Sequence, residues 1–213
     1  MYRVNIAVVY QQKINSMGRR SKRVKKNYPP PKKILAVRGP LTRSELLSQG
    51  ISCPEVFGDP VLLFPLYYNP SLDKKYKVGI VLHFLESREN VRCCGFDSTQ
   101  IHFISVKKYG SWKNFIDEVC MCDTVLSSSL HGCIVADAYN IPNLWTQFTD
   151  YVAEEDGFKF RDYYLSTQRN IKKPIKIATI DEGYEMAKTV WTPIKIDLDL
   201  LMSVCPFKSM NRR

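Results

Sequence analysis

The segment at residues 124–142 combines side chains that could bind an anion and move a proton. Residues 124–126 predict the end of a buried strand, and three serines follow it before a helix opens over residues 130–139. The N-terminus of such a helix presents unpaired N–H groups and the positive end of the helix dipole, which together favour anions. The residues that we assign to this turn are Ser127, Ser128, Ser129, Leu130, His131 and Gly132.

These residue types suit a phosphorylated ligand. Serine hydroxyls add hydrogen-bond donors, and Gly132 lets a ligand approach the backbone closely. His131 can donate to a phosphate or act as a general acid. The alternative is that the serines only cap the helix and that His131 is an ordinary edge residue. The His-Gly pair at a strand–helix junction favours a site that includes His131 over this alternative.

Alternating strands and helices must position this turn. Strand patterns lie at residues 34–37, 77–84, 100–106, 124–126 and 143–146, with a short stub at 56–57. Helix patterns lie at residues 42–49, 111–122, 130–139, 181–191 and 197–203. We expect the first helix to open with a capping box of Thr42 and Glu45. The alternation predicts an α/β fold, a Rossmann-like parallel sheet whose ligands bind outside the carboxyl ends of the strands.

Charge divides the chain into two parts. Residues 1–33 carry ten Lys or Arg and no acid, whereas the remainder holds 21 basic and 21 acidic residues, so the leader carries the whole net charge of +10. We therefore predict a basic, disordered leader or remnant over residues 1–33 and a Rossmann-like domain over residues 34–213. The leader could contact an anionic membrane face. Nucleic acid is not an expected partner, because no recognition motif with interleaved aromatics accompanies the basic run.

The seven cysteines indicate a reducing compartment. Their number is odd, their spacing is irregular, and the sequence shows no secretory signal or membrane span. We therefore expect free thiols and a cytoplasmic protein, at the inner face of the membrane if the leader binds lipid. Cys93 with Cys94 and Cys120 with Cys122 lack a matching second pair, and His102 supplies no zinc-finger spacing, so no metal site is expected.

Several segments resemble the polysaccharide pyruvyl transferase family, in its bacterial exopolysaccharide type. The turn Ser127-Ser-Ser-Leu-His-Gly132 and the Tyr-Asn-Ile-Pro that ends at Pro142 are similar to the family's signature. Further blocks resemble segments of the family and follow in the same order, at residues 36–43, 57–65, 78–84 and 157–164. The resemblance covers about residues 34–206.

The resemblance implies that a pyruvyl group is transferred from phosphoenolpyruvate to two sugar hydroxyls, which forms a ketal on a surface or extracellular polysaccharide. It implies no cofactor, phosphoenolpyruvate as donor substrate, and a glycan or lipid-linked sugar as acceptor. The fold would correspond to the C-terminal half of a two-domain (GT-B-like) transferase. Arg38 and His131 map onto donor-binding positions. His131 would protonate the methylene carbon or assist phosphate departure.

Several other residues are candidates for supporting roles, and each has a structural alternative. Arg38 could form only a structural salt bridge, and Asp59 could either orient a basic residue or cap the following turn. His83 could be a ligand or a packing residue at a strand end. Lys159 and Arg161 could close over an anion from the loop after the sheet, or remain solvated. The supporting candidates are Arg43, Asp59, His83, Lys159 and Arg161.

Two departures from the family's pattern bear on activity. Ser129 stands where many members have an arginine, so Arg43, Lys159 or Arg161 would have to supply that charge. The family's N-terminal half has no counterpart in residues 1–33, so we expect a fragment that is inactive by itself. The alternatives are a nucleotide-sugar glycosyltransferase of GT-B type, for which we identify no ribose-binding or base-stacking residues, and a non-catalytic remnant.

Overall fold

The computed structural model describes residues 6–7, 33–91, 96–107, 109–149 and 157–206. The strands are β1 (Ile6–Ala7), β2 (Lys33–Ile34), β3 (Tyr76–Val81), β4 (Ile101–Ile104), β5 (Cys122–Ser127), β6 (Asn143–Gln147) and β7 (Ile175–Lys176). The α-helices are α1 (Pro40–Ser48), α2 (Trp112–Cys120), α3 (Leu130–Ala138), α4 (Phe158–Ser166), α5 (Ile180–Val190) and α6 (Leu198–Ser203). Short 3₁₀ segments are η1 (Pro60–Leu66), η2 (Arg88–Asn90) and η3 (Ser98–Gln100). Most of the predicted leader lies outside the described residues.

Five strands form a wholly parallel sheet in the order β4-β3-β5-β6-β7. The chain leaves β3 for β4 on one side and then returns past β3 to β5 on the other. This reversal makes the carboxyl ends of β3 and β5 the topological switch point, which is where ligands bind in such sheets. The prediction of a Rossmann-like parallel α/β fold is confirmed.

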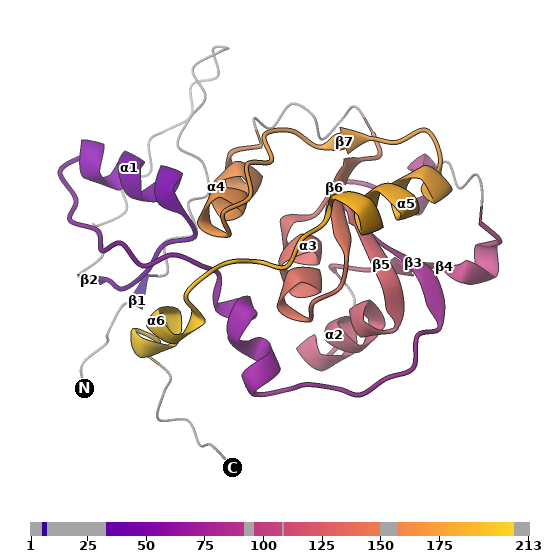
Figure 1. The fold of residues 1–213 in the computed structure, drawn as a ribbon, viewed down its shortest axis with the longest axis horizontal. Coiled ribbons are helices and arrows are strands. Elements are labelled where there is room, and N and C mark those ends of the chain that lie inside the picture. The colour runs from indigo at the N-terminus through magenta and orange to yellow at the C-terminus, as the bar shows by residue number, and fades with distance from the viewer. Residues whose placement is uncertain (1–5, 8–32, 92–95, 108, 150–156, 207–213) are drawn as a thin grey trace.

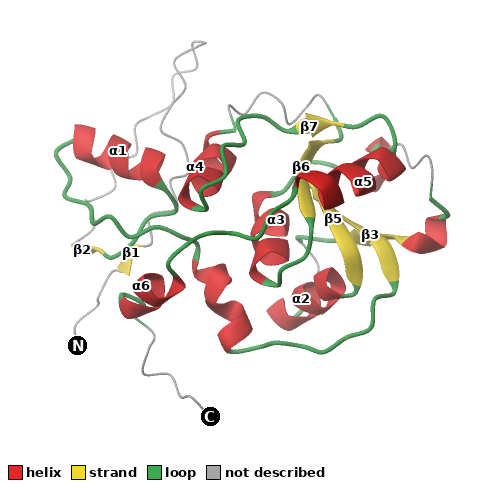
Figure 2. Cartoon of the chain, in the orientation of Figure 1, coloured by secondary structure: helices red, strands yellow, loops and turns green. Residues whose placement is uncertain are grey.

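Helices cover both faces of this sheet (Figures 1 and 2). Helices α2 and α3 pack on one face, against Val81 and Val125. Helix α5 packs on the other, against Ile80 and Leu126. Val125 and Leu126 are neighbours in β5 and both are fully buried, because successive side chains of a strand point to opposite faces. The sheet therefore has an apolar layer on each side, and polar groups gather where its strands end.

The strand predicted at residues 34–37 is largely wrong. Only Lys33 and Ile34 form a strand, which pairs in parallel with β1 outside the five-stranded sheet. Val37 instead forms a single parallel bridge with Phe57. Ile34 and Val37 are buried, but they pack with Leu46 of α1 and not in the five-stranded sheet, so their apolar pattern does not mark a longer strand. The bridge brings together the segments that continue to Arg38 and Asp59.

The start of α1 also differs from the prediction. The helix begins at Pro40, whose missing N–H suits the first helical position, and Thr42 lies within the first turn instead of at the cap. Asp162 caps this helix from 120 residues away, accepting from the N–H groups of Leu41 (2.9 Å) and Thr42 (3.1 Å). The Thr42 hydroxyl also donates to Asp162. A carboxylate from α4 therefore replaces the predicted capping box.

Helix α4 occupies residues that the sequence analysis treated as a loop after the sheet. Its N-cap, Gly157, has φ +64°, in the left-handed region that favours glycine. Its inner face buries Asp162, Tyr163 and Tyr164. The helices predicted at 111–122, 130–139, 181–191 and 197–203 agree with α2, α3, α5 and α6 to within two residues at each end.

The cysteines of the described ranges are free thiols. Burial raises the pKa of Cys120 to about 11 and that of Cys122 to about 12. These thiols therefore stay protonated and pack as small apolar side chains. Cys93 and Cys94 lie outside the described residues.

Candidate functional site

The Ser127 hydroxyl holds the turn between β5 and α3. It can donate to the carbonyl oxygen of Val81 (3.0 Å) or of Ser129 (2.7 Å), and it accepts from the Ser129 N–H (3.0 Å). Ser127 is fully buried. Its hydroxyl therefore fixes the turn to β3 and faces the protein interior.

Gly132 lies on the inner side of α3. A Cβ at this position would be 2.4 Å from Ser127 Oγ and 2.8 Å from Val81 Cβ, both far inside normal contact distance. The missing side chain therefore lets α3 approach the ends of β3 and β5. The further prediction, that Gly132 admits a ligand to the backbone, stays a prediction.

Gly132→Val should lower the free energy of unfolding by about 1–3 kcal/mol, the range for overpacked cores. Lys188→Val, on the exposed surface of α5, is a control for the helix propensity of valine. Urea denaturation of both variants measures the difference. An unfolding midpoint for Gly132→Val equal to that of the wild type would contradict the close contact.

Ser128 belongs to a polar cluster at the carboxyl ends of three strands. Its Oγ accepts from the His83 N–H (2.9 Å) and bonds to the Glu86 carboxylate. Glu86 also accepts from the His83 N–H (3.2 Å) and from the Thr149 hydroxyl (2.7 Å). Glu86 therefore joins the ends of β3, β5 and β6 at the switch point. Sequence reasoning missed Glu86, because only the strand order brings it to Ser128.

His131 lies among charged side chains from three separate segments. The residue is exposed at the surface, yet the protein atoms around its ring desolvate it and lower its pKa below the ordinary value. Asp59 opposes this effect on the pKa, whereas Arg38 and Lys159 add to it. The structure thus brings together four of the predicted residues, His131, Arg38, Asp59 and Lys159.

Asp59 and Arg38 are both buried beside this histidine. Asp59 accepts from the Val61 N–H (3.1 Å) and so caps η1, while its charge also acts on His131. The capping role considered for Asp59 is therefore present, and its role in orienting a basic residue stays a prediction. Arg38 acts electrostatically on His131 and on Asp162, the carboxylate that ties α1 to α4.

Arg43 and His83 have contacts of their own. The Arg43 Nε donates to the carbonyl oxygen of Cys53 (3.3 Å). The His83 ring packs against Phe84, with 4.4 Å between ring centroids. Arg161 lies on α4, but it is not among the charges that shift the pKa of His131.

The resulting arrangement suits a small anion. Arg38, Lys159 and Asp59 lie within electrostatic reach of His131, in the first turn of α3, where the N-terminus of the helix favours anions. Ser129, the N-cap of this helix, makes no capping bond with its own hydroxyl. A dianion bound here would raise the pKa of His131, because the opposite charge favours imidazolium.

Comparison with known families shows which family the chain belongs to. A family model described as polysaccharide pyruvyl transferase matches residues 13–146, which is more than half of the chain. The chain belongs to the polysaccharide pyruvyl transferase family. The matched region contains Arg38, Asp59 and His131, whereas Lys159 lies beyond it. The match begins inside the segment that we treat as a leader, so the boundary at residue 34 stays a prediction.

Two curated relatives align with part of this pyruvyl transferase family member. The succinoglycan biosynthesis protein ExoV of Rhizobium meliloti (strain 1021) is 28% identical over 131 residues, which is 61% of this chain and 39% of ExoV. The uncharacterized protein L143 of Acanthamoeba polyphaga mimivirus is 26% identical over 113 residues, 50% of this chain and 38% of L143. The matches thus span about two-fifths of each relative. No solved structure matches the chain.

Two further observations concern membrane and metal binding in this family member. Across residues 33–91, 96–107, 109–149 and 157–206, no helix is long and apolar enough to cross a bilayer. In the same part of the chain, His, Cys, Asp and Glu side chains form no group of three or more that could hold a metal ion.

Proposed function

We propose that this chain carries the donor site of a pyruvyl transferase and that the donor is phosphoenolpyruvate. The acceptor would be sugar hydroxyls of a surface or extracellular polysaccharide, or of its lipid-linked precursor, modified in the cytoplasm at the inner face of the membrane. The observation that carries the proposal is the gathering of Arg38 and Lys159 around His131, at a helix N-terminus on the switch point. Phosphoenolpyruvate has a phosphate and a carboxylate, and fixed cations with helix N–H groups bind both.

Two further observations support this proposal. The relative ExoV is, by its name, a succinoglycan biosynthesis protein, which favours a polysaccharide acceptor. Of the residues considered as substitutes for the arginine that Ser129 replaces, Lys159 acts on His131, whereas Arg43 lies outside the proposed donor site and donates to the carbonyl oxygen of Cys53. We therefore assign the compensating charge to Lys159.

In the proposed reaction, His131 gives a proton to the methylene carbon of phosphoenolpyruvate, and one sugar hydroxyl adds to the neighbouring carbon. A second hydroxyl then adds to the same carbon as its bond to the phosphate oxygen breaks. Two hydroxyl protons are released, so that one replaces the proton lost from His131 and the other leaves with inorganic phosphate. Arg38 and Lys159 would neutralise the donor, and Asp59 would favour the protonated form of His131.

Arg38→Ala should weaken phosphoenolpyruvate binding by about 10–100-fold, which corresponds to about 1.5–3 kcal/mol for a hydrogen bond to a charged group. Arg43→Ala is the matched control, because it removes the same charge from a nearby position that is bonded to Cys53. Calorimetric titration of both variants with phosphoenolpyruvate measures the difference. Equal affinities would remove Arg38 from the donor site.

Because Arg38 is buried, its replacement could unfold the domain, so a second pair of variants is needed. Lys159→Ala should also weaken binding, whereas Lys172→Ala, which removes an exposed charge, should not. A nucleotide-sugar that binds the wild type while phosphoenolpyruvate does not would support the glycosyltransferase alternative. Binding of neither ligand would support a non-catalytic remnant.

A further inference from the structure

Helix α4 lies between α3, which carries His131, and α1, which begins just after Arg38 (Figure 1). On one side, its Tyr163 and Tyr164 share an apolar cluster with Ile134 of α3. On the other side, α4 contacts α1. The way in which α4 is attached to each neighbour therefore bears on where Arg38 lies relative to His131.

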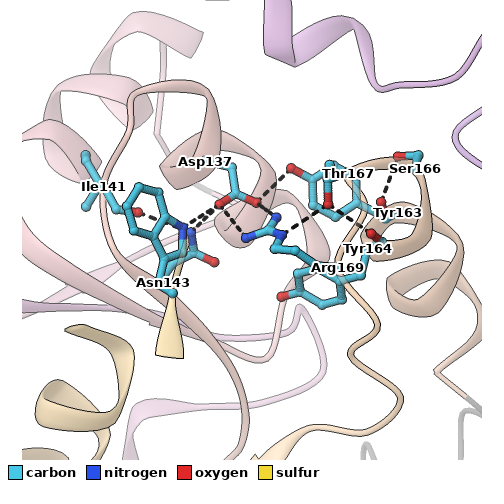
Figure 3. A network of polar contacts seen from close by, with 9 residues as sticks. Asp137, Ile141, Asn143, Tyr163, Tyr164, Ser166, Thr167 and Arg169 are labelled. Carbon is cyan, nitrogen blue, oxygen red and sulfur yellow. Dashed lines mark hydrogen bonds and ion pairs between the residues drawn. The ribbon is translucent and has the colours of Figure 1, made fainter. Parts of the chain in front are cut away.

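Asp137 attaches α4 to α3 (Figure 3). The Tyr163 hydroxyl of α4 donates to the buried Asp137 carboxylate (2.8 Å). Arg169, which follows α4, pairs with the same carboxylate, and its Nη1 lies 3.1 Å from Asp137 Oδ1. Because both α4 and the chain after it are bonded to α3, α4 has a fixed position relative to His131.

Asp162 attaches the other side of α4 to the start of α1. Its Oδ1 accepts from the N–H groups of Leu41 (2.9 Å) and Thr42 (3.1 Å), and its Oδ2 accepts from the Thr42 hydroxyl. A Cβ at Gly39 would lie 1.9 Å from the carbonyl oxygen of Asp162, so the backbone before α1 rests directly on that of α4. Arg38 is the residue before Gly39, so this junction determines where the Arg38 backbone lies.

Arg38 and Lys159 reach His131 from these two attached segments. Lys159 and Asp162 are three residues apart on α4, a spacing that puts them on neighbouring parts of the helix surface. Burial raises the pKa of Asp162, whereas its hydrogen bonds to Thr42 and the charge of Arg38 lower it, so Arg38 lies within electrostatic reach of Asp162. Arg38 and Lys159 both act on His131. Because two cations at one site repel each other, other contacts must hold their segments together before an anion binds.

We propose that Asp162 is a positioning residue of the donor site, which holds Arg38 and Lys159 in place for a small anion. This role rests on the donor site proposed above. Asp162 is fully buried and both its carboxylate oxygens are bonded to α1, so it acts through Arg38 and not on the ligand. An anion that meets a preformed site does not have to order the two segments, and this preorganisation strengthens binding.

Sulfate binding by the full chain tests this role, because sulfate needs the cations but none of the chemistry of pyruvyl transfer. Asp162→Ala removes all three bonds to α1 and should weaken sulfate binding by about tenfold or more, as expected when a hydrogen bond from Arg38 to the anion is lost. Calorimetry measures the affinity, and urea denaturation identifies conditions in which each variant is folded. A purely structural role would lower stability but leave the affinity of the folded protein unchanged.

Asp162→Asn is the matched control. Its amide oxygen can still accept from the N–H groups of Leu41 and Thr42, and its amide nitrogen can donate to the Thr42 hydroxyl. This variant should therefore bind sulfate as tightly as the wild type. In an Arg38→Ala background, Asp162→Ala should cause no further loss of affinity, because the two residues act through the same contact.

Thr42 provides a second pair of variants that decides the question even if Asp162→Ala does not fold. Thr42→Ser keeps the hydroxyl that donates to Asp162, whereas Thr42→Val removes it and keeps the shape of the side chain. Thr42→Val should bind sulfate more weakly than Thr42→Ser, by about two- to tenfold for the loss of one hydrogen bond.

The possible results separate this role from the proposed function. If folded Asp162→Ala binds sulfate as the wild type does, or if the two Thr42 variants bind it alike, the positioning role is overturned while the donor site stands. The expected losses for sulfate in a chain that does not bind phosphoenolpyruvate would support the role of Asp162 and overturn only the choice of donor. A wild type that binds neither anion would overturn the donor site and the positioning role together.

Discussion

Asp137→Ala should lower the free energy of unfolding by about 3–5 kcal/mol, the loss expected when one partner of a buried ion pair is removed. The Asp137 side chain is fully buried and that of Arg169 is only 10% exposed. Burial alone lowers the pKa of Arg169, but Asp137 outweighs it and raises the pKa above its ordinary value. The variant would therefore leave a buried charge without its counterion, and Tyr163 and Trp191 without an acceptor.

Thermal unfolding measures this loss, because each kcal/mol shifts the melting temperature by about 2–4 °C in a chain of this size. The matched control is Asp117→Ala on α2, which removes a half-buried carboxylate bonded to the Tyr68 hydroxyl (2.7 Å). The control should shift the melting temperature much less. Similar shifts for the two variants would show that the Asp137 network contributes little to stability.

Local patterns were enough to predict the turn that carries His131. The buried strand, the three serines and the following helix are neighbours in sequence, and β5 and α3 lie where these patterns place them. The parallel sheet follows from the same alternation of strands and helices. The pattern could not predict which way each serine side chain points. Ser127 bonds to β3 and Ser128 bonds to Glu86, and these partners depend on the order of the strands in the sheet.

The contacts that the sequence analysis missed all join distant segments. Asp162 caps α1 from α4, and Asp137 binds Arg169 after α4 and Trp191 after α5. No local signal marks these carboxylates, because each acts on groups far away in sequence. The same reason explains the error at Thr42, where a plausible capping box is replaced by a carboxylate from another helix.

His131→Ala should weaken phosphoenolpyruvate binding by about 1.5–3 kcal/mol, which is what a hydrogen bond to a charged group contributes. In a complete enzyme, the turnover of pyruvyl transfer should also fall by about a hundredfold or more, as it does when a general acid is lost. The physical reason is the position of His131 at the start of α3, within electrostatic reach of Arg38, Asp59 and Lys159.

Binding by the wild type should also depend on pH. In the unbound chain, desolvation lowers the pKa of His131, Asp59 opposes this, and Arg38 and Lys159 lower the pKa further. A bound anion favours imidazolium and raises this pKa, so affinity should be highest at low pH and fall as the pH rises through the value in the complex. The phosphate itself loses a proton near pH 6 and so changes affinity in the opposite sense. Sulfate keeps its charge over this range and isolates the contribution of His131.

Calorimetric titrations with phosphoenolpyruvate and with sulfate, over about pH 5.5–8, test the role of His131 around the ordinary histidine pKa of about 6.5. The matched control is His102→Ala, since His102 lies on the edge strand β4, stacked on Tyr76 and paired with Glu118. Wild type and His102→Ala should bind sulfate more weakly as the pH rises, whereas His131→Ala should show weak binding that hardly changes with pH. If His131→Ala binds both anions as the wild type does, with the same pH dependence, His131 does not contact the anion. Its assignment as the general acid of pyruvyl transfer would then be wrong.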